Sequence, residues 1–195
     1  MFILTKIADL VQISPENFGR PSHLAIEDSI NAKYSNKVIQ KIGLCICMYD
    51  LLWASEGLIG HGNGVVNVNV EFRLIVFRPF KGETMFGRIS HATKDGISIR
   101  TEFFEDIYVE YKELPENTQY DHNEGAWTWF PEPGGDPLWY DKNEMVRFQV
   151  IEEDWHDQTP ESTEQEAVDR AKKLSPYRVK GTMLKGGLGV CLWWE

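Results

Sequence analysis

The segment 65–77, VVNVNVEFRLIVF, alternates apolar and polar side chains with a period of two. Successive side chains of a β-strand point to opposite faces, so this pattern predicts a strand with one buried and one polar face. The run 38–52, VIQKIGLCICMYDLL, is apolar on both faces, with its even-numbered and odd-numbered residues on opposite sides. Such a strand is covered on both sides, by its own domain or by a partner. The two strands together predict a long hairpin whose end is 53–64.

The residues before this hairpin complete a small domain. Residues 1–13 alternate well enough to predict a first strand, and two prolines with a glycine then mark a loop at 15–21. Ser22 is the expected N-cap of a helix that runs to about Tyr34. The order strand–helix–strand–strand predicts an α+β domain over residues 1–80.

A second pattern, in the domain expected over 81–195, is all β. An Asp-Gly pair turns its first hairpin, and its connections have uneven lengths. Five short antiparallel strands of this kind predict a barrel of the oligonucleotide-binding (OB) type. The strands are expected at about 83–92, 96–101, 105–110, 145–155 and 177–194.

Two connections in this second domain have unusual compositions. Residues 127–140, WTWFPEPGGDPLWY, predict a loop whose tryptophans seal one end of the barrel or meet a partner. The polar insertion 157–176 has a capping box and is either a short surface helix or a mobile loop. In the last strand, Trp193 and Trp194 are expected on opposite faces, so that one of them packs between domains or against another chain.

The formal net charge of −10 is unevenly distributed. Residues 1–80 hold seven basic and seven acidic side chains, so 81–195 hold 13 basic and 23 acidic ones. An acidic half does not favour tight, nonspecific DNA binding, because neutralising phosphates needs a basic surface. It is more typical of plain solubility, or of a surface for a basic protein partner.

Membrane and redox signals point to an intracellular chain without a membrane partner. No apolar run approaches the roughly 18 residues of a membrane helix. The apolar start 1–13 contains Lys6 and Asp9 and lacks a cleavage site, so it predicts a strand and not a signal peptide. The three cysteines are too few and too local for a disulfide framework, and we expect buried thiols in a reducing compartment.

The stretch 57–64, GLIGHGNG, raises the hypothesis of a nucleotide-dependent enzyme. A phosphate loop leads into a helix and has a Lys and a Ser or Thr just after its glycines. Here a predicted strand without Lys follows, and the glycines are spaced G-x-x-G-x-G-x-G. We therefore expect a glycine-rich connection between strands and no nucleotide cofactor.

No pattern in the chain indicates catalysis or a metal. The five histidines stand far apart in sequence, and none has a cysteine at metal-binding spacing. The carboxylate run 152–154 lies on a predicted strand, where its members point alternately to opposite faces and form a solvated edge. The sequence predicts no catalytic residue, no metal and no cofactor.

The barrel offers candidates for contact with nucleic acid. Small barrels bind single strands through aromatic and basic side chains on one face. Most aromatic residues here are expected in the core, and Tyr108 is the best surface candidate because its two apolar neighbours would point inward. The predicted nucleic-acid contacts are Arg88, Lys94, Arg100, Tyr108 and Arg147.

Taken together, several segments resemble a family of RNA polymerase stalk subunits. The family includes the archaeal E-prime subunit and the seventh-largest subunit of RNA polymerase II, and the likeness is closest to the polymerase III member. It covers nearly the whole chain apart from about 157–176. The segments that carry it are MFILTKIADLVQI, KVIQKIGLCICMYDLL with the glycine stretch, NVEFRLIVFRPFKGE, FEDIYV, YDKNEMVRFQV and GLGVCLWWE.

This resemblance implies an α+β tip domain followed by an S1-type OB barrel, in a subunit without its own active site. It further implies a heterodimer with a second, helical stalk subunit lodged between tip domain and barrel, and the strand 42–51 is our best candidate for part of that surface. The dimer would attach to the polymerase core and act with initiation factors at genes for small RNAs, in the nucleus. The loop 15–21 would lie beside the docking loop. The residues that the resemblance assigns to docking are Gly57, Gly60, His61, Gly62, Asn63 and Gly64.

The barrel departs from the S1 pattern at two places. Its second strand has Ile97 and Ile99 where an aromatic residue is usual, and Val109 and Glu110 replace the histidine that follows the third strand. We therefore expect weak contact with single-stranded RNA, or contact that needs the partner's surface. Two alternatives stay open: a stalk subunit of another RNA polymerase, and a free-standing S1-type module that binds single-stranded RNA.

Overall fold

The computed structural model describes residues 1–60, 62, 64–132, 134–156 and 175–194. The chain divides into two compact units, Met1–Arg78 and Pro79–Glu195. Within the described residues, no helix is long and apolar enough to cross a membrane. Most of the polar insertion predicted at 157–176 lies outside the described residues, as do His61 and Asn63 of the predicted docking loop.

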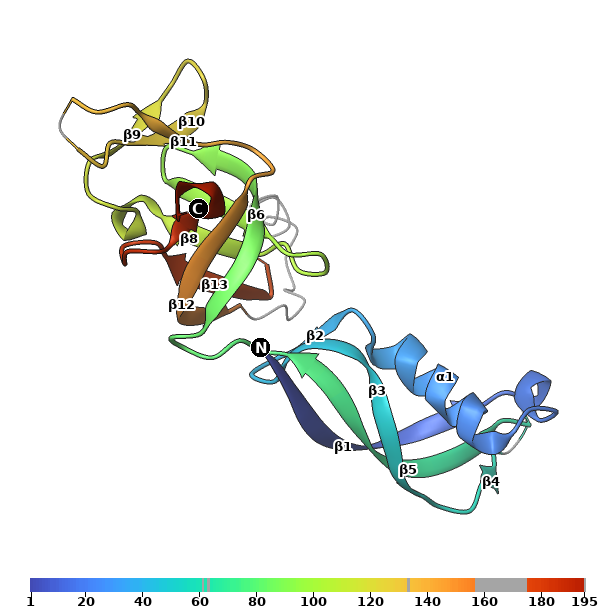
Figure 1. The fold of residues 1–195 in the computed structure, drawn as a ribbon. Coiled ribbons are helices and arrows are strands. Elements are labelled where there is room, and N and C mark those ends of the chain that lie inside the picture. Colours follow the sequence, from blue (N-terminus) through green and yellow to red (C-terminus); the bar gives the residue numbers. More distant parts are fainter. Residues whose placement is uncertain (61, 63, 133, 157–174, 195) are drawn as a thin grey trace, which may run out of the picture. The chain divides into compact units, whose positions relative to one another are not determined.

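The first unit is a twisted antiparallel sheet with one helix, α1 (Ser22–Tyr34), across one face (Figure 1). The strand order is β1–β5–β3–β2, and the short β4 also pairs with β5. A 3₁₀ turn, Pro15–Asn17, precedes the helix. This arrangement confirms the predicted α+β class. The strands are β1 (Phe2–Ile13), β2 (Lys37–Ile39), β3 (Gly43–Ala54), β4 (Leu58–Ile59) and β5 (Val66–Phe77).

The core of this unit lies between β5 and α1. Every second residue of β5 from Val68 to Val76 is almost fully buried, which is the face that the sequence pattern predicts. These side chains pack in one cluster with Ala25, Ile26 and Ile30 of α1. A hydrogen bond of 2.8 Å from the Tyr34 hydroxyl to the Asp9 carboxylate also ties the end of α1 to β1.

Three details of the first unit correct the sequence predictions. The run 38–52 is not one strand, because a turn at 40–42, with Lys41 at φ 62°, separates β2 from β3. Three register shifts along β3 then break its alternation, so the even–odd division of its faces is wrong. Ser22 is the first helical residue and not the cap, since Pro21 occupies the N-cap position without a side-chain hydrogen bond.

The second unit is a closed five-stranded barrel (Figure 1). The strand order is β13–β8–β7–β6–β12, and pairing of β12 with β13 closes the ring. The OB-type barrel predicted from the sequence is thus confirmed. The prediction that all five strands are antiparallel is wrong, because β8 and β13 run parallel. The strands are β6 (Thr84–Thr93), β7 (Gly96–Arg100), β8 (Ile107–Glu110), β12 (Met145–Trp155) and β13 (Tyr177–Thr182), with β14 (Gly189–Val190) added to β12 and a 3₁₀ turn at Tyr111–Glu113.

The barrel interior is filled by side chains, and Phe148 is one of the largest of them. Phe148 is fully buried, and two glycines make room for its ring and for the neighbouring Ile99. A Cβ atom at Gly181 would lie 2.8 Å from the ring, and one at Gly87 would lie 2.4 Å from the Ile99 side chain. Both distances are shorter than real contacts, so these positions require glycine for packing.

The tryptophan-rich segment 127–140 is not a loop as predicted. It contributes two strands of a three-stranded sheet, β9 (Thr118–Asp121), β10 (Ala126–Trp129) and β11 (Leu138–Tyr140), in the order β11–β10–β9. Trp127 is buried, and its Nε1 donates a hydrogen bond of 2.8 Å to the Thr93 carbonyl. Each strand has only three or four residues, and prolines and glycines lie between two of them. The alternation of buried and exposed side chains is therefore too short to recognise in the sequence.

The C-terminal segment also differs from its prediction. Only Tyr177–Thr182 and Gly189–Val190 are strands, and Cys191–Trp194 form a 3₁₀ helix. Trp193 and Trp194 therefore do not lie on opposite faces of a strand. Both approach Trp129, with ring centroids 5.2 and 6.2 Å from the Trp129 ring.

The three cysteines are free, and burial raises the pKa of Cys45 to about 11.

Two leucines of the first unit give a matched test of this core. Leu74 is fully buried in β5, whereas Leu58 of β4 is 70% exposed. Leu74→Ala should lower the free energy of unfolding by about 2–5 kcal/mol, because it leaves a cavity against α1. Leu58→Ala should change it by less than about 0.5 kcal/mol. Urea unfolding followed by circular dichroism measures both, and equal effects would contradict the assigned core.

Candidate functional site

The end of the β3–β5 hairpin is built by backbone hydrogen bonds. Ser55 N–H donates to the Asn69 carbonyl at 2.9 Å, and Asn69 N–H donates to Ser55 Oγ at 3.0 Å. Beyond this point β4 pairs with the start of β5, and Gly60 N–H donates to the Val65 carbonyl at 2.8 Å. Of the predicted docking loop 57–64, the described residues form the short strand β4 and a turn at Gly62, at the end of the sheet (Figure 1).

Three of the glycines predicted for docking serve the path of the backbone. Gly62 and Gly64 have φ values of 90° and 68°, a region that residues with a Cβ atom rarely adopt. A Cβ atom at Gly57 would lie 2.5 Å from Val66 Cγ1. A Cβ atom at Gly64 would lie 3.5 Å from Pro15, so the turn passes beside the loop 15–21. No contact of His61 or Asn63 is assigned, since both lie outside the described residues.

The tip presents apolar side chains that the sequence prediction did not include. Leu58 and Ile59 are 70% and 73% exposed, and Phe18 of the chain's first loop is also exposed. A cavity of about 370 Å³ lies at this end of the unit, lined in part by Phe18, Ile26 and Gly57. Exposed apolar groups that cluster mark contact sites. The signal in the sequence was the Leu-Ile pair between two glycines.

On the barrel, three of the five predicted nucleic-acid contacts share one outer face. Arg88 lies directly opposite Arg100 on β7 and opposite Met145 on β12. Arg147 is two residues beyond Met145 and therefore faces the same side, because its neighbours Val146 and Phe148 are fully buried. The structure thus brings Arg88, Arg100 and Arg147 together.

These three arginines are held by neighbouring groups. Arg88 Nη1 donates to the Asn143 carbonyl at 3.1 Å, and Arg100 Nη2 donates to Asn143 Oδ1 at 3.0 Å. The Arg147 guanidinium lies 5.1 Å from the centre of the exposed Phe86 ring. Phe86, which the prediction left out as an expected core residue, gives this face an aromatic platform next to Arg147. Such a combination suits contact with a single strand.

The other two predicted contacts lie at the opposite end of β7. Lys94 is exposed in the turn between β6 and β7. Tyr108 is half-buried on β8, where its ring leans over Gly96 and lies 5.9 Å from the Arg178 guanidinium. Burial raises the pKa of the Tyr108 hydroxyl. Lys94 and Tyr108 therefore form a second location, separate from the three arginines.

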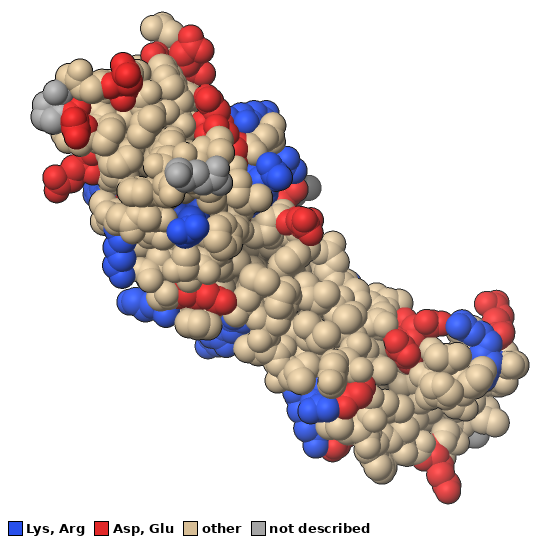
Figure 2. Space-filling model, viewed as in Figure 1, with Lys and Arg blue, Asp and Glu red and all other residues tan. Residues whose placement is uncertain are grey.

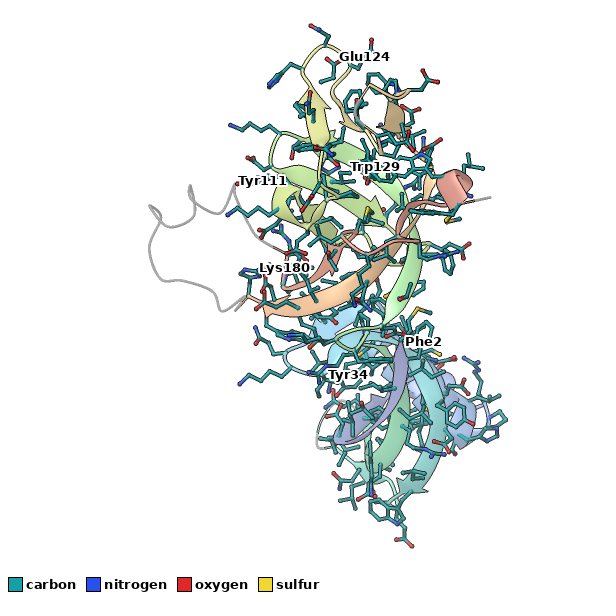
Figure 3. The ribbon with its side chains drawn as sticks, turned by 60° about the vertical axis from the view of Figure 1, so that its left-hand side comes forward. Phe2, Tyr34, Tyr111, Glu124, Trp129 and Lys180 are labelled. Atoms are coloured by element: carbon teal, nitrogen blue, oxygen red, sulfur yellow. The ribbon has the colours of Figure 1, made fainter. Side chains whose placement is uncertain are left out.

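Charges around the barrel are mixed. Lys180 of β13 pairs with Glu152 at 3.2 Å and with Asp154 at 2.9 Å, and Figure 3 labels it on the outer side of its strand. Hydrogen bonds to these carboxylates raise the pKa of Lys180, and the bond to Asp154 has the larger effect. Acidic side chains dominate over the β9–β11 end of the second unit, and lysine and arginine side chains lie on more than one side of it (Figure 2). Among the described residues no group of His, Cys, Asp and Glu is placed to hold a metal ion.

An α+β unit with a glycine-rich hairpin end, followed by a closed OB-like barrel, is the architecture that the resemblance to RNA polymerase stalk subunits implies. Two family profiles match the chain. An SHS2 domain found in the N terminus of Rpb7p/Rpc25p/MJ0397 matches residues 8–64, and RNA polymerase III subunit Rpc25 matches residues 83–194.

Three relatives match along their lengths. The DNA-directed RNA polymerase III subunits rpc8 of Schizosaccharomyces pombe and RPC8 of Saccharomyces cerevisiae are each 38% identical to this chain, with 100% of both sequences covered. RPC8 of Bos taurus is 33% identical and covers 100% of this chain and 98% of its own length. The chain belongs to the Rpb7-related family of RNA polymerase stalk subunits, in its RNA polymerase III branch. The resemblance stated from the sequence is confirmed.

The glycines at the tip provide a local test. Gly57→Ala should lower the free energy of unfolding by about 1–3 kcal/mol, because the new methyl group overlaps Val66. Gly19→Ala is the matched control, since a Cβ atom there meets nothing within 4 Å. Thermal unfolding of the two variants checks the difference. If Gly57→Ala were as stable as Gly19→Ala, the described packing of the hairpin end would be wrong.

Proposed function

We propose that this chain is a non-catalytic stalk subunit of nuclear RNA polymerase III. It docks on the polymerase core through the tip, pairs with a second, helical stalk subunit, and supports initiation at genes for transfer RNA and other small RNAs. The observation that carries the proposal is full-length similarity to polymerase III subunits at 38%, 38% and 33% identity. Similarity that spans both units, and not the barrel alone, favours a stalk subunit over a free-standing RNA-binding module.

The tip is the proposed docking element. Leu58 and Ile59 are exposed apolar side chains on a short strand, so binding to a pocket would remove them from water. Burying an exposed leucine or isoleucine contributes about 1.5–3 kcal/mol. Gly57 leaves room for Val66 before this pair, and Gly62 and Gly64 adopt the positive φ values that the chain needs after it.

The second stalk subunit is proposed to cover part of β3. Tyr49, Leu52 and Trp53 follow one another closely on this strand, and all three are exposed. Their aromatic and aliphatic surfaces are of the kind that interface cores use. This location agrees with the strand 42–51 expected from the sequence and extends it by two residues.

Weak contact with emerging RNA is proposed for the barrel face of Arg88, Arg100 and Arg147. Three guanidinium groups on one face, one of them beside the Phe86 ring, provide both charge and a stacking surface. The acidic balance of the second half of the chain limits long-range attraction of phosphates. The contact is therefore expected to be weak and strongly salt-dependent.

Docking is tested with variants of the tip. Leu58→Ser combined with Ile59→Ser should lower recovery of core subunits about tenfold or more in pull-downs from nuclear extract, quantified by mass spectrometry. The second stalk subunit should still be recovered. Leu192→Ser is the control, because Leu192 is 66% exposed but lies in the second unit. Unchanged core recovery with the double variant would refute the docking role.

RNA contact is tested by fluorescence anisotropy with a single-stranded oligouridine at low salt. Replacing Arg88, Arg100 and Arg147 by alanine should weaken binding about tenfold and reduce its salt dependence. A variant with Lys94→Ala and Tyr108→Ala separates the two locations and should change the affinity less. No measurable binding of the unmodified chain, or equal losses in both variants, would contradict the assigned face.

A further inference from the structure

The sheet β9–β10–β11 has one face on the barrel, and on its other face no element of the described residues packs. Trp127 and Tyr140 lie opposite each other on β10 and β11, and both are buried on the barrel side. Alternation along the strands places Thr128, with Gln119 and Trp139 opposite it, on the other face.

A pocket of about 410 Å³ opens on that face. Gln119, Thr128 and Trp139 line it, and Phe130 adds a second aromatic ring. Tyr120 and His122 border the pocket, but Tyr120 lies opposite Trp127 on the barrel side, with its ring 5.3 Å from the Trp127 ring. Faces of aromatic rings carry negative potential, so a pocket lined by two aromatic residues, Trp139 and Phe130, attracts a cation.

The segment around the pocket carries acidic side chains and no lysine or arginine. Residues 115–141 contain six Asp and Glu residues and no Lys or Arg. Asp121 lines the pocket, where its carboxylate accepts a hydrogen bond of 2.8 Å from Asn123 N–H. Glu124 lies at the outer end of the turn between β9 and β10 (Figure 3). The acidic side chains over this end of the second unit are visible in Figure 2.

We propose that this face, the pocket with its acidic surround, binds a lysine- or arginine-rich segment of a protein. One basic side chain enters the aromatic pocket, and its neighbours in the segment meet the carboxylates that are spread over 115–141. The carboxylates are distributed along the sheet and its turns, which fits an extended basic chain better than a single ion. The carboxylates here would repel phosphates, whereas the arginine face of the barrel would attract them. The two surfaces therefore suit different ligands.

This inference goes beyond the proposed function and does not depend on it. The tip, β3 and the arginine face account for the polymerase core, the second stalk subunit and RNA. The β9–β11 face is a further surface, on a sheet that the sequence pattern had predicted as a loop. Failure of polymerase docking would leave this binding intact, and the reverse also holds.

The test uses an octalysine peptide with blocked ends and the full chain, measured by isothermal titration calorimetry at low salt. Trp139→Ala removes a wall of the pocket, and Gln119→Lys adds a positive charge at its exposed flank. Each should weaken binding about tenfold or more. Tyr111→Ala and Glu102→Lys are matched controls, since both residues are exposed and neither lines the pocket. They should change the affinity by less than about twofold.

Gln119→Lys also guards against misfolding, because Gln119 is exposed and its replacement removes no packing. If Glu102→Lys weakened binding as much as Gln119→Lys, the peptide would be held by diffuse net charge and the proposal would be wrong. It would also be wrong if Gln119→Lys had no effect. Octauridylate is titrated in parallel, and tighter binding of this RNA to the same pocket, abolished by Trp139→Ala, would overturn the choice of a basic protein segment.

Discussion

The packing of β5 against α1 is the constraint on which the first unit depends. The alternating buried residues of β5 join one cluster with the apolar side of α1, and the strand also pairs with β1, β3 and β4. The hairpin end can remain short and rich in glycine because its backbone pairs with β5, which the core holds in place. Exposure of Leu58 and Ile59 costs little stability, because neither side chain belongs to the core cluster. The buried face of β5 thus stabilises the unit, while the residues proposed for docking lie on the separate short strand β4.

The second unit separates its roles in a similar way. A closed ring of strands buries Phe148 and its neighbours, and the alternating residues outside the ring carry the arginines. The added sheet β9–β11 packs through Trp127 and Tyr140, which leaves its outer face for acidic and aromatic groups. Basic and acidic surfaces therefore belong to different parts of one unit. This arrangement lets a chain with a net charge of −10 present a local basic face.

Much of the fold could be predicted from the sequence because period-two alternation is a direct consequence of strand geometry. Residues 66–77, the helix 22–34 and the barrel strands follow from this and from helical spacing. The bulges of β3 could not be predicted, since an apolar run on both faces looks the same with or without an extra residue. The sheet β9–β11 was missed because its strands are too short to show a period. At the tip the glycines were found, while Leu58 and Ile59 needed exposure values that only a structure provides.

The central claim is that the end of the β3–β5 hairpin enters a pocket on the polymerase core. Site-specific photo-crosslinking tests it most directly. A photoreactive amino acid is placed at Leu58, or at Leu192 as a control of similar exposure, in chains assembled into RNA polymerase III in nuclear extract. The account predicts that position 58 crosslinks to large core subunits and that position 192 does not. Crosslinks to the core from position 192 with none from position 58 would contradict it.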